Sequence, residues 1–248
     1  MLKSFSYIEY QKIIERLISR LPLLDFTDIN TNTERFCVIR HDIEFSVDRA
    51  LNLALFESEV LGIQSSYLFQ LRNNCYNIIS DVNIKKLHAI QSLGHTVGLH
   101  CHMNQLESLT DVKKAIRDEA TAFSKLTGIS VDRFSFHRPS KFLLKNHIQV
   151  DGLINCYDKA FFHYYETPHD NLDVKYLTDS RHEWHHGYPL DCQHNKIQLL
   201  THPYSWSPEG ANNLKNYKNI LAEKSLELRQ SINRETSTFP QSLLLDGS

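Results

Sequence analysis

The sequence lacks several features that define common protein classes. Its 248 residues contain no run approaching the roughly 20 apolar residues needed to span a bilayer, so no transmembrane segment is predicted. It has no excess of positive charge, because 27 Lys and Arg residues face 29 Asp and Glu residues. That balance excludes the electrostatic signature of a nucleic-acid-binding protein. No GxGxxG or Walker-type loop follows the first apolar run, which argues against a nucleotide site.

A disulfide framework is also not expected. The five cysteines are odd in number, scattered along the chain and without a CxxC pair, which favours free thiols in a reducing cytoplasm. The N-terminal segment has no continuous apolar core, because charged residues interrupt it. Its apolar spacing predicts an amphipathic helix over residues 4–20 instead of a targeting signal. We therefore expect a cytoplasmic protein.

Short apolar runs alternate with segments of helical periodicity. The predicted strands are 35–40, 65–70, 95–100, 134–137, 153–157, 174–178 and 197–201. Helical patterns lie between them and close the chain at 214–232. This alternation predicts parallel β/α units with right-handed crossovers. Six or seven strands suit a single α/β domain over residues 1–248, built as a distorted or incomplete (β/α) barrel with a loosely ordered tail from about 236. A doubly wound open sheet is the alternative.

Chemically active side chains follow five of these strands where each one ends. They are Asp42, Glu44, His100, His102, His137, Arg138, Asp179 and His202. Because the carboxyl ends of parallel barrel strands share one face, we expect these side chains to meet at one mouth. Carboxylate oxygens and imidazole nitrogens suit zinc or a similar divalent metal. The residue types needed for metal-assisted hydrolysis are therefore present.

At these residues the sequence resembles the polysaccharide deacetylase (NodB-homology, family four carbohydrate esterase) superfamily, and most of all its branch in bacterial surface-polysaccharide gene clusters. The segments that carry the resemblance are RHDIEFS (40–46), GHTVGLH (94–100), FSFHRPS (134–140) and LTHP (200–203). A weaker motif is LTDS (177–180). The ordered set spans residues 35–206.

The resemblance implies a NodB-like distorted barrel that hydrolyses an N-acetyl or related acyl group on a sugar or sugar precursor. By position, Asp42 corresponds to the general base and Arg138 to the arginine that orients it. Glu44 and His100 correspond to metal ligands, with zinc as the expected metal. His202 corresponds to the general acid that protonates the leaving amine.

Two departures concern the metal ligands. Position 44 holds glutamate where the family usually has aspartate, and Asn104 occupies the place of the second metal histidine. We expect His102 to substitute for that histidine, since residues two apart in a strand point to the same side. His41 is a further candidate ligand.

Other polar and aromatic residues are predicted to contact the substrate, an amino-sugar derivative or glycan. These are His137, Asp179 and Trp184. The nearby histidines 182, 185 and 186 could form a second metal site only if their segment is helical, and a substrate-contacting loop is favoured. Two other functions remain open: a non-catalytic deacetylase-like barrel that binds a glycan or protein partner, and a metal hydrolase acting on a different amide or ester.

Overall fold

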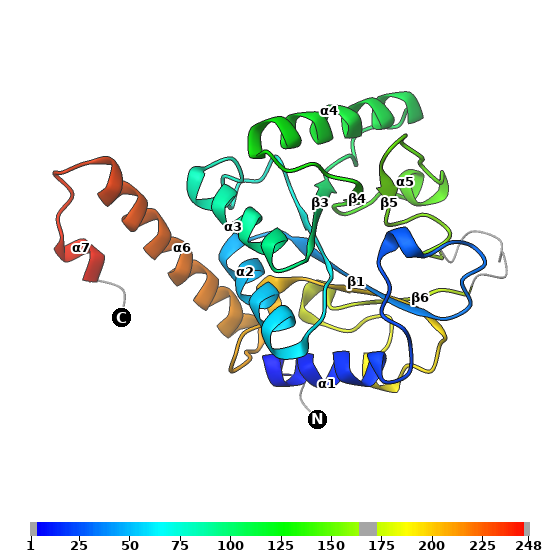
Figure 1. The fold of residues 1–248 in the computed structure, drawn as a ribbon. Helices are drawn as coiled ribbons and strands as arrows, with labels where there is room; N and C mark the ends of the chain where they lie inside the picture. Colours follow the sequence, from blue (N-terminus) through cyan, green and yellow to red (C-terminus); the bar gives the residue numbers. More distant parts are fainter. Residues whose placement is uncertain (1–3, 164–172, 246–248) are drawn as a thin grey trace.

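Seven parallel strands form one curved sheet, which the computed structural model describes over residues 4–163 and 173–245 (Figure 1). The sheet order is β5-β4-β3-β2-β1-β7-β6. The strands are β1 Phe36–Ile43, β2 Ser66–Phe69, β3 Thr96–Cys101, β4 Arg133–Phe136, β5 Ile154–Asn155, β6 Lys175–Thr178 and β7 Lys196–Thr201. All eight residues of β1 are buried, as expected for a central parallel strand covered on both faces.

The barrel is incomplete, because no pairing joins the edge strands β5 and β6 within the described residues. Side chains bridge the gap instead. The rings of Phe162 and Tyr176 are 5.1 Å apart, and the Gln198 amide donates to the carbonyls of Cys156 and Phe161. The predicted distorted, incomplete (β/α) barrel with parallel strands is thus confirmed.

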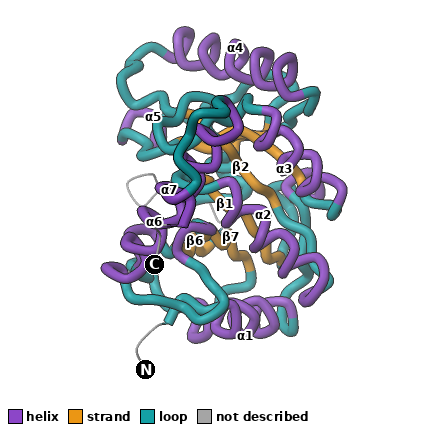
Figure 2. Tube along the Cα trace, turned by 90° about the vertical axis from the view of Figure 1, so that its left-hand side faces the viewer, coloured by secondary structure: helices purple, strands orange, loops and turns teal. Residues whose placement is uncertain are grey.

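Helices surround the sheet, with α1 and α4 at opposite ends of the molecule (Figure 2). The helices are α1 Tyr7–Ile18, α2 Val47–Leu55, α3 Asp81–Ser92, α4 Leu109–Thr127, α5 Lys141–Lys145, α6 Asn213–Glu235 and α7 Ser242–Leu245, with a π-helical turn η2 Phe56–Leu61 after α2. The first six α-helices each begin after a Ser or Asn side chain that accepts a backbone N–H, which satisfies an otherwise unpaired donor. None of the helices in the described part has the length and apolar content to cross a membrane.

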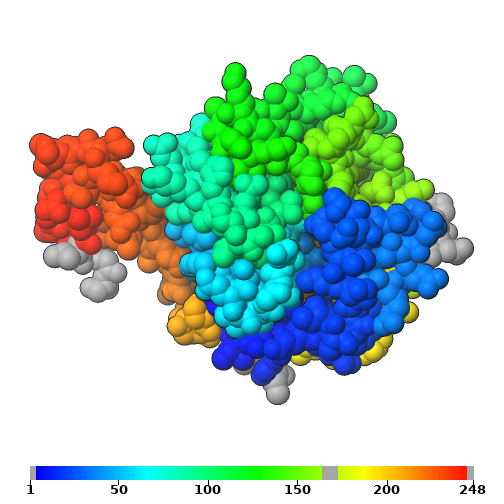
Figure 3. Space-filling model, in the orientation of Figure 1, coloured from blue at the N-terminus to red at the C-terminus, as the bar shows by residue number. Residues whose placement is uncertain are grey.

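The chain ends in a helical arm whose outer part stands apart from the rest of the molecule. In Figure 3 the end of α6 and all of α7 project from the body as an orange and red arm. The beginning of α6 is anchored by Arg49, which donates to Asn216 at 2.7 Å and pairs with Glu223 at 2.7 Å. This anchor fixes α6 beside the carboxyl end of β1, because Arg49 lies in the helix that follows that strand.

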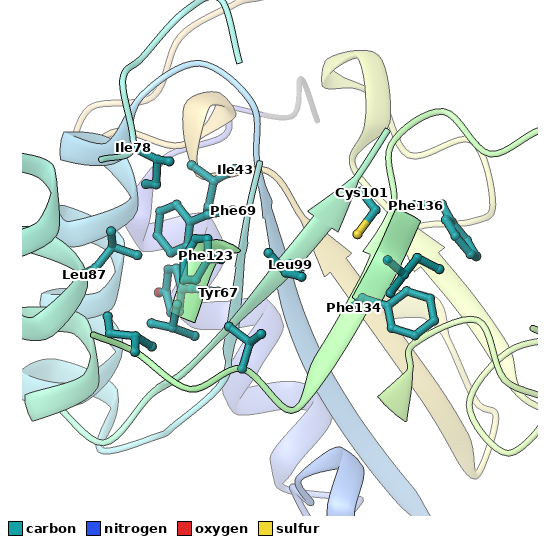
Figure 4. Close-up of a cluster of buried hydrophobic side chains, with 14 of the residues drawn as sticks. Ile43, Tyr67, Phe69, Ile78, Leu87, Leu99, Cys101, Phe123, Phe134 and Phe136 are labelled. Carbon is teal, nitrogen blue, oxygen red and sulfur yellow. The ribbon is translucent and has the colours of Figure 1, made fainter. Parts of the chain in front are cut away.

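The largest apolar cluster packs between the sheet and helices α3 and α4 (Figure 4). It includes Phe69, Leu99, Phe123 and Phe134, all fully buried. Gly98 in β3 leaves no room for a side chain, because an added Cβ would lie 2.5 Å from Leu68 and 2.9 Å from the carbonyl of residue 133. The close packing of β3 against its neighbours therefore depends on glycine. All five cysteines are free thiols, as predicted.

A buried polar network surrounds Glu57 in η2. The carboxylate accepts hydrogen bonds from the hydroxyls of Tyr10, Tyr67 (2.7 Å) and Ser65 (2.6 Å), and His41 Nε2 lies 3.1 Å away. Burial opposes ionisation of Glu57, but the nearby His41 lowers the pKa of this carboxyl group to about 2. Glu57 is therefore charged near neutral pH. The network ties α1, η2 and β2 to the carboxyl half of β1.

Candidate metal centre

Glu44, His100 and His137 converge where β1, β3 and β4 end. One ligand atom from each of the three side chains lies within 4.8 Å of the others. His137 Nε2 is 3.2 Å from a Glu44 carboxylate oxygen, and the rings of His100 and His137 are 5.2 Å apart. The parallel register pairs His100 with Ser135, which carries His137 to the same end of the sheet. A carboxylate and two imidazoles are thus brought together from segments 93 residues apart in the chain.

The orientation of His100 leaves one nitrogen available as a ligand. Its Nδ1 lies 2.7 Å from Ser135 Oγ, and that hydroxyl donates to Asp42 Oδ1 at 3.0 Å. Since the serine proton goes to Asp42, His100 Nδ1 is the donor to the serine oxygen, and Nε2 carries the lone pair. His100 Nε2 is buried and has no hydrogen-bond partner in the described structure.

The charges of these groups also suit a cation. Burial lowers the pKa of His100 to about 4, so its imidazole is neutral near pH 7. For Glu44, burial acts against ionisation, but the hydrogen bond with His137 and the neighbouring His202 lower the pKa to about 2. Two imidazoles and one carboxylate form a three-ligand set typical of catalytic zinc, so these residues fit a divalent metal.

The remaining ligand candidates lie elsewhere. His102, the predicted second metal histidine, is exposed and packs its ring against His137, with 5.0 Å between centroids. The histidine that meets Glu44 and His100 is His137, for which a substrate contact was expected. Strand β3 ends at Cys101, so the alternation of side chains along the strand does not determine the direction of His102. His41 points away from the centre into the Glu57 network, where Thr201 Oγ1 lies 2.7 Å from its Nδ1.

Asp42 lies beside the metal cluster with a buried arginine. Arg40 Nη2 is 3.5 Å from Asp42 Oδ2, and the Arg40 guanidinium lies 4.4 Å over the ring of Tyr157. Burial opposes ionisation of Asp42, but Arg40 and His100 hold its pKa below the ordinary value. Arg138, expected to orient this carboxylate, is instead exposed. The guanidinium that contacts Asp42 is therefore that of Arg40, because residues two apart in β1 share a side of the strand.

His202 is held as a charged group by Asp179. His202 Nδ1 lies 2.6 Å from Asp179 Oδ1, and the other Asp179 oxygen accepts from Trp206 Nε1 at 2.7 Å. Burial disfavours the imidazolium, but Asp179 outweighs it and raises the pKa of His202 to about 9. Asp179 is fully buried behind His202. The structure thus gives Asp179 a positioning contact in place of the predicted substrate contact.

The predicted sugar-stacking residue, Trp184, does not face the site. Only 6% of its surface is exposed, and its ring packs 6.3 Å from that of Trp206 in the cluster beneath α1. Nor do the neighbouring histidines form a second metal site in the described part of the chain. His182 is buried with Nε2 on the Ala211 carbonyl, whereas His185 and His186 are exposed.

Two cavities meet at the metal cluster. One, of about 1020 Å³, is lined by Asp42, Glu44, His100 and His202 and by a set of aromatic rings that includes Tyr157, Phe162, Tyr176, Tyr204 and Tyr217. The other, of about 1480 Å³, runs between the loop after β2 and α6. Glu44, Phe45 and Arg138 line both. The parallel register of β1 and β7 pairs His41 with Thr201, so Asp42 and His202 follow on neighbouring strands at the same mouth.

The fold and the site together define an incomplete parallel barrel with a His/Glu cluster at its mouth that could hold a metal ion. No protein-family model matches the sequence, and no curated protein matches it either. Among solved structures, the chain is similar to a chitin deacetylase from Colletotrichum lindemuthianum (14% identity, TM-score 0.46, covering 82% of this chain and 88% of that one). It is also similar to a family 4 acetyl xylan esterase from Clostridium thermocellum in complex with a cobalt ion (15%, 0.41, covering 67% and 73%).

A third similar structure is a family 4 pseudoenzyme from Bacillus anthracis, with 11% identity and a TM-score of 0.45, covering 80% of this chain and 63% of that one. Each of these three TM-scores is below 0.5, so the chemistry of the site has to be derived from its own side chains.

Arg40 and Ser135 contact the site but were not among the residues predicted from the sequence, although the strand pattern indicates both. Arg40 precedes Asp42 by two positions in β1, and Ser135 precedes His137 by two positions in and after β4. Alternation along a strand places such pairs on one face. The residue two positions before Asp42 contacts Asp42, and the residue two positions before His137 contacts His100.

Proposed function

We propose that this protein is a metal-dependent hydrolase that removes an N-acetyl or related acyl group from an amino sugar. One observation carries the proposal: His202, which is paired with Asp179, lines the same cavity as Asp42, Glu44 and His100, and His137 joins Glu44 and His100 in one cluster of ligand atoms. This arrangement offers a proton acceptor, a proton donor and a metal-binding set to a single bound amide.

Each side chain has a defined part in amide hydrolysis. Glu44, His100 and His137 would hold the metal, with zinc favoured by the ligand types. When bound, a divalent metal polarises the acyl oxygen and lowers the pKa of water. Asp42, kept ionised by Arg40, accepts the proton of the attacking water.

His202 supplies the proton at the other end of the reaction. It is protonated near pH 7 because its pKa is about 9, and it donates to the nitrogen as the C–N bond breaks. Asp179 keeps the imidazole ring oriented through Nδ1, so that Nε2 is the nitrogen left for the substrate. The products are the carboxylic acid and the free amine of the sugar.

The motif pattern supports a narrower assignment within this proposal. The resemblance of RHDIEFS (40–46) and the motifs that follow it favours a role in bacterial surface-polysaccharide (O-antigen or capsule) biosynthesis. In the cytoplasm, the substrates would be sugar precursors and not finished polymer. A non-catalytic barrel is the alternative that Glu44 and Asn104 motivate. Against it, His137 lies beside Glu44 and His100 and would supply the ligand that Asn104 does not.

Metal analysis followed by acetate release from N-acetylated sugars tests the proposal. We expect near-stoichiometric divalent metal, and acetate release that falls at least a hundredfold in Asp42→Asn, because the proton acceptor is lost. Asp48→Asn is the matched control, since this exposed acid pairs with Lys86 outside both cavities. Protein without bound metal would refute the proposal. Full turnover in Asp42→Asn would remove Asp42 from its role, and metal with glycan binding but no acetate would favour the non-catalytic alternative.

A further inference from the structure

Helix α6 is long, yet very little of it is packed against the barrel. Only two of its 23 residues, Asn216 and Ile220, are buried. No residue of α6 beyond Ile220 is buried within the described structure, and this outer part projects from the body in Figure 3. A helix in water gains most of its stability from packing one face against another surface. The outer part of α6 is therefore the element of the described fold that most needs a further surface to cover it.

The exposed apolar side chains of α6 form one continuous stripe. Six of the thirteen large apolar residues that are exposed in the described structure lie in this single helix. Five of the six are spaced by three, four, seven and four residues, which places them on one face of the helix. We call this set the α6 stripe: Leu214, Tyr217, Leu221, Leu228 and Ile232. It extends for about 27 Å, at 1.5 Å per residue. An apolar patch of this extent marks an interaction site.

The charges on α6 indicate which kind of surface covers the stripe. The helix contains five Lys and Arg residues and three Glu residues, whereas the whole chain has a net charge of −2. Lys215 and Lys218 are exposed, and Lys218 lies within four residues of both Leu214 and Leu221, directly beside the stripe. Apolar side chains on one face with lysines beside them are typical of a helix that lies in the surface of an anionic bilayer.

The same pattern disfavours a second copy of the chain as the covering surface. Two paired helices need apolar residues at both the a and the d positions of each heptad. With the three stripe leucines at a, the d positions hold Tyr217, Lys224 and Ser231. Two of these three are polar, so the stripe lacks the second apolar row that helix pairing requires.

We propose that the α6 stripe binds the surface of an anionic lipid bilayer, with Lys215 and Lys218 beside the lipid phosphates. The stripe reaches both cavities, because Tyr217 lines the cavity that contains Asp42 and Leu228 lines the other. A bilayer bound to α6 therefore lies next to the mouth of the barrel, where a sugar attached to a membrane component is within reach. The inference goes beyond the proposed function and does not depend on it, since it is drawn from α6 alone.

Cosedimentation of the full chain with lipid vesicles tests the proposal. We expect binding to vesicles of equal parts phosphatidylglycerol and phosphatidylcholine that is at least tenfold stronger than binding to phosphatidylcholine alone. Leu221→Glu should weaken binding at least tenfold, because it removes apolar surface and adds a charge that the lipids repel. The double variant Lys215→Gln/Lys218→Gln should weaken binding about tenfold on the anionic vesicles only. Ile8→Glu is the matched control, since Ile8 is as exposed as the stripe leucines but lies in α1, and it should leave binding unchanged.

Three results would overturn the bilayer proposal. These are no binding to the anionic vesicles, equal binding by wild type and Leu221→Glu, and a wild-type dimer in sedimentation equilibrium that Leu221→Glu converts to monomer. The last result would assign the stripe to a second copy of the chain. Acetate release from a soluble N-acetylated sugar should be the same in wild type and Leu221→Glu, because Leu221 lines neither cavity. Vesicle binding by a protein that releases no acetate would support the bilayer site and count only against the deacylase.

Discussion

Replacement of Asp179 by asparagine should convert His202 from a charged to a neutral residue near pH 7.5. In the native protein the pKa of His202 is about 9, against an ordinary value of 6.5. At pH 7.5 the native imidazole is almost fully protonated, whereas a histidine with a pKa of 6.5 is only about one-tenth protonated. We therefore expect about a tenfold loss of the protonated general acid, in addition to any loss of orientation.

The same pairing contributes to stability with a defined sign. Because the pKa of His202 is raised in the folded state, the stabilisation is fully present below pH 6.5 and is lost as the pH rises through about 9. The displacement from 6.5 to about 9 corresponds to about 3 kcal/mol, since one pKa unit is about 1.4 kcal/mol. His202 is only 6% exposed, so solvent screening removes little of this contribution.

The assay is an NMR titration of the His202 ring in chelator-treated protein, with His202→Gln to assign the resonance. Wild type should titrate near pH 9 and Asp179→Asn at or below 6.5. Urea unfolding between pH 6.5 and 9 should show the loss of stability in wild type but not in the variant. Asp173→Asn, which removes an exposed acid from the same cavity, should leave the His202 titration unchanged. An Asp179→Asn protein whose His202 still titrates near pH 9 would refute the reasoning.

Three further changes test other parts of the structure. His137→Ala should weaken zinc binding by at least a hundredfold in a chelator competition, whereas His102→Ala should weaken it less than tenfold; the reverse order would restore the ligand expected from the sequence. Glu57→Gln should lower the free energy of unfolding by about 3 kcal/mol at pH 7, because several buried donors lose a charged acceptor. The difference from wild type should shrink as the pH falls from 4.5 through about 2, where the native carboxylate is protonated. Gly98→Ala should destabilise the folded protein by about 1–3 kcal/mol in the same urea assay. An unchanged unfolding midpoint would mean that the neighbouring strands can move apart to accommodate the methyl group without cost.

The sequence predicted the fold well, because the barrel depends on signals that are local. Apolar runs of strand length mark β1, β3 and β7, and the polar residue after each run marks the mouth of the barrel. Asp42, Glu44, His100 and His202 follow from that rule alone. The side-chain contacts that bridge the gap between β5 and β6, such as that of Phe162 with Tyr176, could not be predicted, since they join segments that show no shared pattern in the sequence.

Three of the residues expected at the site make other contacts in the structure. His102 was placed by extending the two-residue alternation of β3 beyond Cys101, where the strand stops. Trp184 was given to the substrate because it is aromatic and lies near a motif, but an apolar ring is equally suited to the core, where it packs against Trp206. Arg138 was placed by resemblance, whereas it is exposed and the guanidinium near Asp42 is that of Arg40. Only three-dimensional contacts distinguish these cases.

The most direct test of the account is to locate the metal by anomalous diffraction at the zinc edge, in crystals grown with zinc. We predict one strong anomalous peak bonded to Glu44, His100 Nε2 and His137, at ligand distances of about 2.0–2.2 Å, with Asp42 and His202 lining the space beside it. A peak bonded to His102 in place of His137, or no peak among these three residues, would contradict the account.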